Sequence, residues 1–118
     1  MDNQPDTVSI LGAEWKIVYR KKKEDAGLQN RGGYCDESVR TIVVRKFHDV
    51  SKPHECADLR AYERLCLRHE IVHAFLYESG LSHSSREARS WATNEEMVDW
   101  IAYQGPKIFE AYKSLGLL

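Results

Sequence analysis

The most constraining feature of this sequence is a long segment with the pattern of a single helix. Residues 58–78 contain neither glycine nor proline, the residues that most often interrupt a helix, and Gly80 follows as a natural C-terminal cap. Residues 71–77 are apolar on nearly every side, which is typical of a buried helix. We therefore predict a helix over residues 57–79 that packs against the rest of the chain.

The N-terminal part of the chain has the pattern of two β-hairpins. Residues 7–11 and 14–20 are predicted strands joined by a turn that includes Gly12. A second hairpin ends in the strand 41–45, which is rich in β-branched residues. Hairpins spanning residues 7–45 and followed by helices predict an α+β fold with an antiparallel sheet.

Two further helices are predicted after the long one. The first spans residues 93–104 and ends near Gly105. Pro106 suits the opening of a second, short helix over residues 106–115, because proline is favoured in the first turn. The aromatic residues at helical spacings in this region are predicted core residues, namely Trp91, Trp100, Tyr103 and Tyr112.

Length and charge narrow the classes of protein to which the chain can belong. Its 118 residues suit one domain, 1–118, and its net charge of −1 provides no attraction to nucleic acid or to an anionic membrane. No apolar run reaches the roughly 20 residues of a bilayer span, and the N-terminus has no signal-peptide pattern. The three cysteines have no paired spacing, which favours free thiols in the cytoplasm.

The motif His-Glu-x-x-His lies within the long predicted helix, at residues 69–73. His69 and His73 are one helical turn apart, so both imidazoles can bind one metal ion at about 2.0–2.1 Å. Glu70 is turned by about 100° from His69 around the helix axis and lies beside the metal. From there Glu70 can take a proton from a metal-activated water and pass it to a leaving amine.

Burial makes a metal the favoured partner of the two histidines. Imidazole nitrogens inside a buried helix need polar partners, and one metal ion satisfies both rings at once. The alternative is a pair of core histidines that are satisfied by backbone or carboxylate groups.

A zinc site of this kind needs a third protein ligand and leaves the fourth position open. Glu95 is our candidate, and Asp99, four residues later on the same predicted helix, can hydrogen-bond the far ring nitrogen of a ligand histidine. Glu96 competes for the ligand role, but Thr93 and Glu96 match a capping box that would occupy Glu96. The alternative is that these acidic residues bind no metal and lie in the solvated first turn of the helix, where the helix dipole favours negative charge.

Other potential ligands match the pattern less well. His83 lies in a predicted loop ten residues after His73 and is predicted to be a surface residue or a substrate contact. Cys66 is about 10.5 Å from His73 along the helix axis, so the two cannot share one metal. All three cysteines are predicted to be small core or loop residues: Cys35, Cys56 and Cys66.

The two motifs, His-Glu-x-x-His at 69–73 and Asn-Glu-x-x-x-Asp at 94–99, resemble the gluzincin pattern of the zincin metallopeptidases. In that pattern the second motif follows the first after about twenty residues, and here Glu95 follows His73 by 22 residues. The size of the chain and its hairpins are similar to those of the small SprT-like and ImmA-type zincins of bacteria and their phages. The resemblance covers about residues 68–100.

The resemblance implies a minimal zincin-like domain that holds one zinc ion. His69, His73 and Glu95 would be the ligands, Glu70 the general base, and Asp99 the residue that orients a ligand histidine.

The resemblance also implies how a substrate would bind. An extended peptide would pair with the edge strand of the sheet, for which residues 41–45 are the candidate. Zincins add a side chain that stabilises the oxyanion, and the candidates here are Tyr77, His83, Arg86 and Tyr103.

The sequence thus predicts a cytoplasmic zinc-dependent metallopeptidase that hydrolyses peptide bonds in a peptide or protein substrate. The alternative is a zinc-stabilised binding or regulatory module on the same fold that never turns over. The fourth coordination position separates the two, because a fourth protein ligand favours the module and an open position favours the enzyme.

Overall fold

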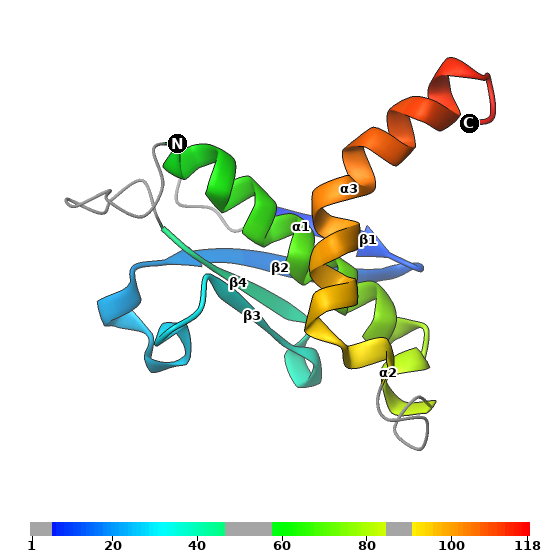
Figure 1. Cartoon of the computed structure of the whole chain (residues 1–118). Coiled ribbons are helices and arrows are strands. Elements are labelled where there is room, and N and C mark those ends of the chain that lie inside the picture. The colour runs from blue at the N-terminus through cyan, green and yellow to red at the C-terminus, as the bar shows by residue number, and fades with distance from the viewer. Residues whose placement is uncertain (1–5, 47–57, 85–90) are drawn as a thin grey trace.

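The computed structural model describes residues 6–46, 58–84 and 91–118 (Figure 1). The strands come first, and they are β1 (Asp6–Ile10), β2 (Ala13–Arg20), β3 (Gly33–Asp36) and β4 (Thr41–Arg45). The helices that follow are α1 (Leu59–Glu78), the short α2 (Leu81–Ser84) and α3 (Glu95–Ser114). This order confirms the predicted α+β class.

The strands form one sheet in the order β1-β2-β4-β3. β1 pairs antiparallel with β2, and β3 pairs antiparallel with β4, so both predicted hairpins are present. The hairpins join through β2 and β4, which run parallel, with Ile17 opposite Ile42. The sheet is therefore mixed rather than antiparallel throughout.

The prediction that residues 41–45 form the edge of the sheet was wrong. β4 lies between β2 and β3, and its central residues Ile42, Val43 and Val44 are buried. A continuous apolar run without alternation is typical of a strand that is covered on both faces, which explains the central position of β4. The edge strand on this side of the sheet is β3.

Helix α1 lies against the sheet and covers the apolar face of the hairpins (Figure 1). Its Ala74 belongs to a buried cluster with Trp15 and Val44 of the sheet. Near the C-terminal end of α1, Glu78 accepts hydrogen bonds from Trp15 Nε1, at 3.0 Å, and from Arg40 Nε. These contacts fix the end of the helix relative to β2 and the turn before β4.

The predicted helix over 57–79 is observed with slightly different ends. Asp58 is the N-cap residue and accepts a hydrogen bond from the Ala61 N–H, at 2.9 Å. Gly80, directly after the C-cap, has a φ of +86°, a left-handed conformation that glycine adopts without strain.

The prediction of separate helices over 93–104 and 106–115 was wrong, because α3 continues through Pro106 without a break. Proline has no N–H, so it cannot bond the carbonyl of Ala102, four residues earlier. Arg68 of α1 supplies the missing donor, since its Nε bonds the Ala102 oxygen at 2.8 Å. A side chain from the neighbouring helix therefore compensates for the proline.

The predicted capping box of Thr93 and Glu96 is not the start of α3. The N-cap residue is Asn94, whose side-chain oxygen accepts a hydrogen bond from the Met97 N–H at 2.8 Å. Asparagine is among the best N-cap residues, so it sets the start one residue later. Glu95 becomes the first residue of the helix.

The aromatic residues predicted for the core are exposed instead. The exposed fractions lie between 49% and 57% for Trp91, Trp100, Tyr103 and Tyr112. Tyr112 is exposed because α3 packs against α1 through its first half and then extends away from the sheet (Figure 1). Trp100 and Tyr103 lie off the buried side of that first half, which Val98 and Ala102 occupy, and Trp91 precedes α3. Phe75 of α1 is also exposed, so that helix is buried only on the sides that face the sheet and α3.

No helix within 6–46, 58–84 and 91–118 is long and apolar enough to cross a membrane. Cys56 and Arg86 lie outside the described residues, so the predictions about them have no structural counterpart here.

Candidate metal centre

The histidines of the His-Glu-x-x-His motif lie side by side on the face of α1 that meets α3. His69 and His73 are one turn apart, and their ring centroids are 4.9 Å from each other in an edge-to-face arrangement. His73 is buried, with 8% of its surface exposed, and its ring stacks on Tyr77. The local helix geometry thus directs both Nε2 atoms toward one point above α1.

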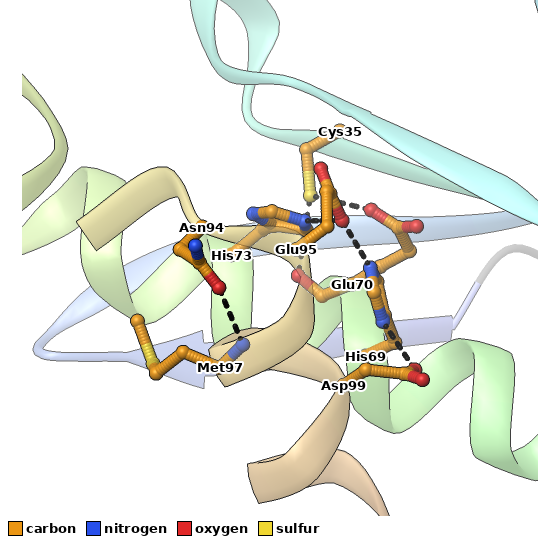
Figure 2. A network of polar contacts seen from close by, with 8 residues as sticks. All are labelled: Cys35, His69, Glu70, His73, Asn94, Glu95, Met97 and Asp99. Atoms are coloured by element: carbon orange, nitrogen blue, oxygen red, sulfur yellow. Dashed lines mark hydrogen bonds and ion pairs between the residues drawn. The ribbon is translucent and has the colours of Figure 1, made fainter. Parts of the chain in front are cut away.

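Glu95 reaches this point from the first turn of α3 (Figure 2). Its Oε1 lies 3.0 Å from His69 Nε2 and 3.2 Å from His73 Nε2. The ligand atoms of these three residues all lie within 4.8 Å of one another. Because the Asn94 cap starts the helix at Glu95, the glutamate is held over the two rings, and the exposed Glu96 is not part of the group.

The two separations between Glu95 and the histidines are close to those of a tetrahedral zinc site. Two ligand atoms about 2.0–2.1 Å from one zinc ion at a tetrahedral angle are about 3.3 Å apart. The observed separations of 3.0 and 3.2 Å are close to that value. Two imidazole nitrogens and one carboxylate oxygen are also a ligand set that zinc accepts.

Asp99 fixes the orientation of His69 from the next turn of α3. Its Oδ1 lies 3.0 Å from His69 Nδ1, on the side of the ring that faces away from Glu95. When Nδ1–H donates to this carboxylate, the neutral ring keeps its lone pair on Nε2, where a metal can bind. The structure thus places Asp99 at the predicted position relative to a ligand histidine.

Glu70 lies beside the three-residue group and is buried, with 6% of its surface exposed. Burial raises the pKa of its carboxyl group above the ordinary value, and the nearby His73 and His69 oppose this rise. A carboxylate with a raised pKa is a better proton acceptor, which suits a general base.

Cys35 of β3 contacts Glu70 directly, and sequence reasoning did not find this contact. The thiol donates toward the Glu70 carbonyl oxygen at 3.2 Å and lies 3.5 Å from Glu70 Oε1 (Figure 2). Burial raises the pKa of this thiol, so it stays a neutral donor at physiological pH. Cys35 is therefore a partner of the glutamate rather than a thiolate ligand.

Gly33 is a second residue that sequence reasoning did not single out. A Cβ atom at this position would lie 2.7 Å from the Val43 carbonyl oxygen and 3.2 Å from Glu70 Cγ. Only glycine lets β3 pass this close to both β4 and the glutamate. The need for glycine depends on strand register, which no local sequence pattern reveals.

The candidate centre opens into a cleft of about 380 Å³ between β3, α1 and α3. The lining residues from α1 and α3 include His69, Glu70, His73, Glu95 and Asp99. Gly33 and Cys35 line the cleft from β3. The remaining lining residues are Arg31, Gly32, Tyr34, Tyr62, Leu65, Cys66, Tyr77 and Tyr103.

The oxyanion candidates differ in whether they line the cleft. Tyr77 and Tyr103 line the cleft. His83 is an exposed residue of the short helix α2 rather than of the predicted loop; its Nε2 lies 3.1 Å from Glu37 Oε2, and it is not among the lining residues.

A comparison with models of protein families found no match, and comparisons with curated proteins and with solved structures found none either.

Proposed function

We propose that this protein is a zinc-dependent metallopeptidase whose metal site is formed by His69, His73 and Glu95. The observation that carries the proposal is the convergence of these ligand atoms within 4.8 Å beside a buried glutamate and a cleft. Each of these features has a separate chemical role in peptide hydrolysis.

The number of protein ligands favours an enzyme over a structural zinc module. Within the described ranges, no fourth histidine, cysteine or carboxylate joins the group at this separation. Structural zinc sites are closed by four protein ligands, whereas catalytic sites have three and keep one position for water or substrate. Glu95, whose side chain is 72% exposed, lies on the solvent side of the group.

Zinc, when bound, would supply a Lewis acid that polarises the peptide carbonyl and makes water more acidic. Glu70 would accept the proton of the attacking water on a carboxylate oxygen and then donate it to the nitrogen of the leaving amine. Cys35 would hold the Glu70 side chain in place, and Asp99 would hold the His69 ring.

We place the peptide substrate along β3 rather than along β4. β3 is the edge strand, and its residues Gly33 and Cys35 line the cleft next to Glu70. An extended peptide that pairs with this edge, which no other described strand occupies, would pass the candidate metal centre. Tyr77 is the preferred oxyanion donor, because it lines the cleft and its ring stacks on that of His73.

The metal content of purified variants tests the ligand assignment. We expect the wild type to retain one zinc ion per chain after dialysis and His69→Ala and Glu95→Ala to lose it. Glu96→Ala is the matched control, because it removes the neighbouring carboxylate, which is outside the group, and it should retain zinc. Stoichiometric zinc in Glu95→Ala would refute the third ligand.

Hydrolysis tests the role of Glu70. We expect Glu70→Gln to keep zinc but to lose cleavage of a quenched fluorescent peptide library by a factor of at least about 100. Full activity in this variant would sink the mechanism. Zinc binding in the wild type without any cleavage would favour the alternative, a zinc-stabilised binding module.

A further inference from the structure

The cleft lining carries a positive charge that the proposed reaction does not use. Arg31 lines the cleft in the turn before β3. The carboxylates of the lining, Glu70, Glu95 and Asp99, come from α1 and α3. The lining thus combines the acidic groups around the candidate metal with one arginine from the segment that leads into β3.

The Arg31 guanidinium lies over an aromatic ring that is itself fixed. Its Cζ is 5.8 Å from the centroid of the Tyr34 ring, a distance at which cation–π attraction operates. The Tyr34 hydroxyl donates a hydrogen bond of 2.6 Å to Asp25 Oδ2. A rigid ring of this kind limits the positions that the guanidinium can adopt.

Asp25 is the carboxylate of this network, and three donors already bind it. Besides Tyr34 it binds Arg20 Nη1 at 2.9 Å and the Gly27 N–H at 2.8 Å. Among the residues that the structure describes, Arg31 has no carboxylate within ion-pair distance. Arg31 therefore adds a positive charge to the cleft lining that has no acidic partner from the described part of the chain.

The backbone of Arg31 lies only two residues before Gly33, which contacts Glu70. Gly33 lies against Glu70, and two residues of chain span at most about 7 Å, so the Arg31 backbone is within that distance of Gly33. A peptide that runs along β3 with its scissile bond at Glu70 would therefore bring a residue one or two positions away near the guanidinium.

We propose that Arg31 is a specificity-determining residue that binds a carboxylate of the substrate, so that the preferred substrates are acidic peptides. The inference rests on the proposed function for the direction of the peptide in the cleft. Guanidinium pairs with carboxylate through charge-assisted, often bidentate hydrogen bonds. The carboxylate has two possible sources, an aspartate or glutamate side chain and the α-carboxylate of a peptide end.

Binding to the zinc-loaded Glu70→Gln protein tests the proposal without turnover. The probes are fluorescein-labelled, C-terminally amidated octapeptides that carry a single glutamate or glutamine at successive positions. A further probe has no acidic side chain and a free C-terminal carboxylate, which separates the two sources. We expect at least one acidic probe to bind about tenfold more tightly than its neutral counterpart in 0.15 M salt.

Two variants show whether Arg31 causes the preference. Arg31→Gln should reduce the tenfold ratio to about one, whereas the control Arg64→Gln, at an exposed position of α1 outside the cleft lining, should preserve it. Equal binding of acidic and neutral probes, no binding of any probe, or a ratio unaffected by Arg31→Gln would each overturn the proposal.

Cleavage of the same probes by the wild-type zinc protein separates this inference from the proposed function. An acidic preference in binding without any cleavage would refute the peptidase and leave the Arg31 subsite standing. Cleavage of glutamate and glutamine probes at equal rates would support the peptidase and refute the subsite.

Discussion

At the scale of single residues, the approach of β3 to Glu70 depends on the missing side chain of Gly33. Adding one carbon there would force the Val43 carbonyl or the Glu70 side chain to move, because the resulting contacts of 2.7 and 3.2 Å are too short. The positions of Glu70, the proposed general base, and of the edge strand β3 thus both require a residue without a side chain at position 33.

We expect Gly33→Ala to lower the free energy of unfolding by about 1–3 kcal/mol and to reduce hydrolysis. Urea denaturation measures the first effect and the peptide library the second. Gly105→Ala is the control, because no heavy atom lies within 4 Å of its added Cβ in α3. That control should raise stability by about 0.5–1 kcal/mol, since alanine is the better helix former. Equal stability of the two variants would contradict the steric argument.

The Asp25 carboxylate predicts a dependence of stability on pH. Hydrogen bonds from Tyr34, from the Gly27 N–H and from Arg20 hold the pKa of Asp25 below its ordinary value. A lowered folded-state pKa adds stability above the unfolded pKa of about 3.9, and this stability is lost as the pH falls through the folded pKa. We therefore expect Asp25→Asn to be less stable than the wild type at pH 7, and the difference to shrink as the pH falls below the unfolded pKa of about 3.9.

Denaturation midpoints in urea between pH 2 and pH 7 check this expectation. Tyr34→Phe removes the hydrogen bond with the largest effect and should raise the Asp25 pKa toward its ordinary value, as measured by NMR titration of the carboxyl group. An unchanged pKa in Tyr34→Phe would show that other groups determine it.

The residues of the candidate site differ in how far sequence could predict them. His69, Glu70 and His73 share one helix, so a spacing of four residues is enough to bring the two rings together. By contrast, Cys35 and Glu70 are 35 positions apart in the chain. Their contact depends on where β3 crosses α1, and so does the need for glycine at position 33. Local patterns carry no information about such a crossing.

At the scale of whole elements, α3 shows how a neighbouring helix can override a local signal. Pro106 was predicted to open a separate helix, and this was wrong because Arg68 supplies the hydrogen bond that the proline cannot make. The same bond joins α1 to α3 at the residue before His69. Arg68 therefore stabilises α3 and the relative placement of the two helices that carry the candidate ligands.

We expect Arg68→Met to destabilise the fold by about 1–2 kcal/mol, because the Ala102 carbonyl loses its donor. Pro106→Ala restores a backbone N–H, so Arg68→Met should cost much less in that background. Urea denaturation of the two single variants and the double variant gives the coupling free energy. Additive effects would indicate that the Arg68 bond does not compensate for the proline.

Element boundaries were predictable where the signal was local and strong. Asp58 and Gly80 delimit α1 within one or two residues of the prediction, as expected from N-cap and C-cap chemistry. At α3 two residues, Thr93 and Asn94, compete for the N-cap, and asparagine occupies it. The edge position of β3 was not predictable, because strand order depends on pairing between hairpins rather than on the hairpins themselves.

At the scale of the molecule, the candidate metal centre joins α1 to α3 through His73 and Glu95, which are separated by 22 positions in the sequence. A ligand that binds only the folded state stabilises it by about 2.7 kcal/mol at a concentration 100-fold above Kd. Zinc should thus raise Tm by roughly 10 °C in a domain of this size.

Differential scanning calorimetry with buffered zinc and with a chelator measures this shift. We expect it to be absent in His69→Ala and preserved in Glu96→Ala, which keeps all three ligands. A shift of equal size in His69→Ala would indicate that zinc acts elsewhere.

The parallel pairing of β2 with β4 has a consequence for the order of folding. Each antiparallel hairpin has neighbouring strands close in sequence and can form in about 1–10 μs. The ladder between Lys16–Arg20 and Thr41–Arg45 joins segments distant along the chain, and such non-local pairing is slow. Among the described strands β3 pairs with β4 alone, so we expect the cleft to take shape after this slow step. The rate of hairpin docking would therefore set how soon a newly made chain becomes able to bind its substrate.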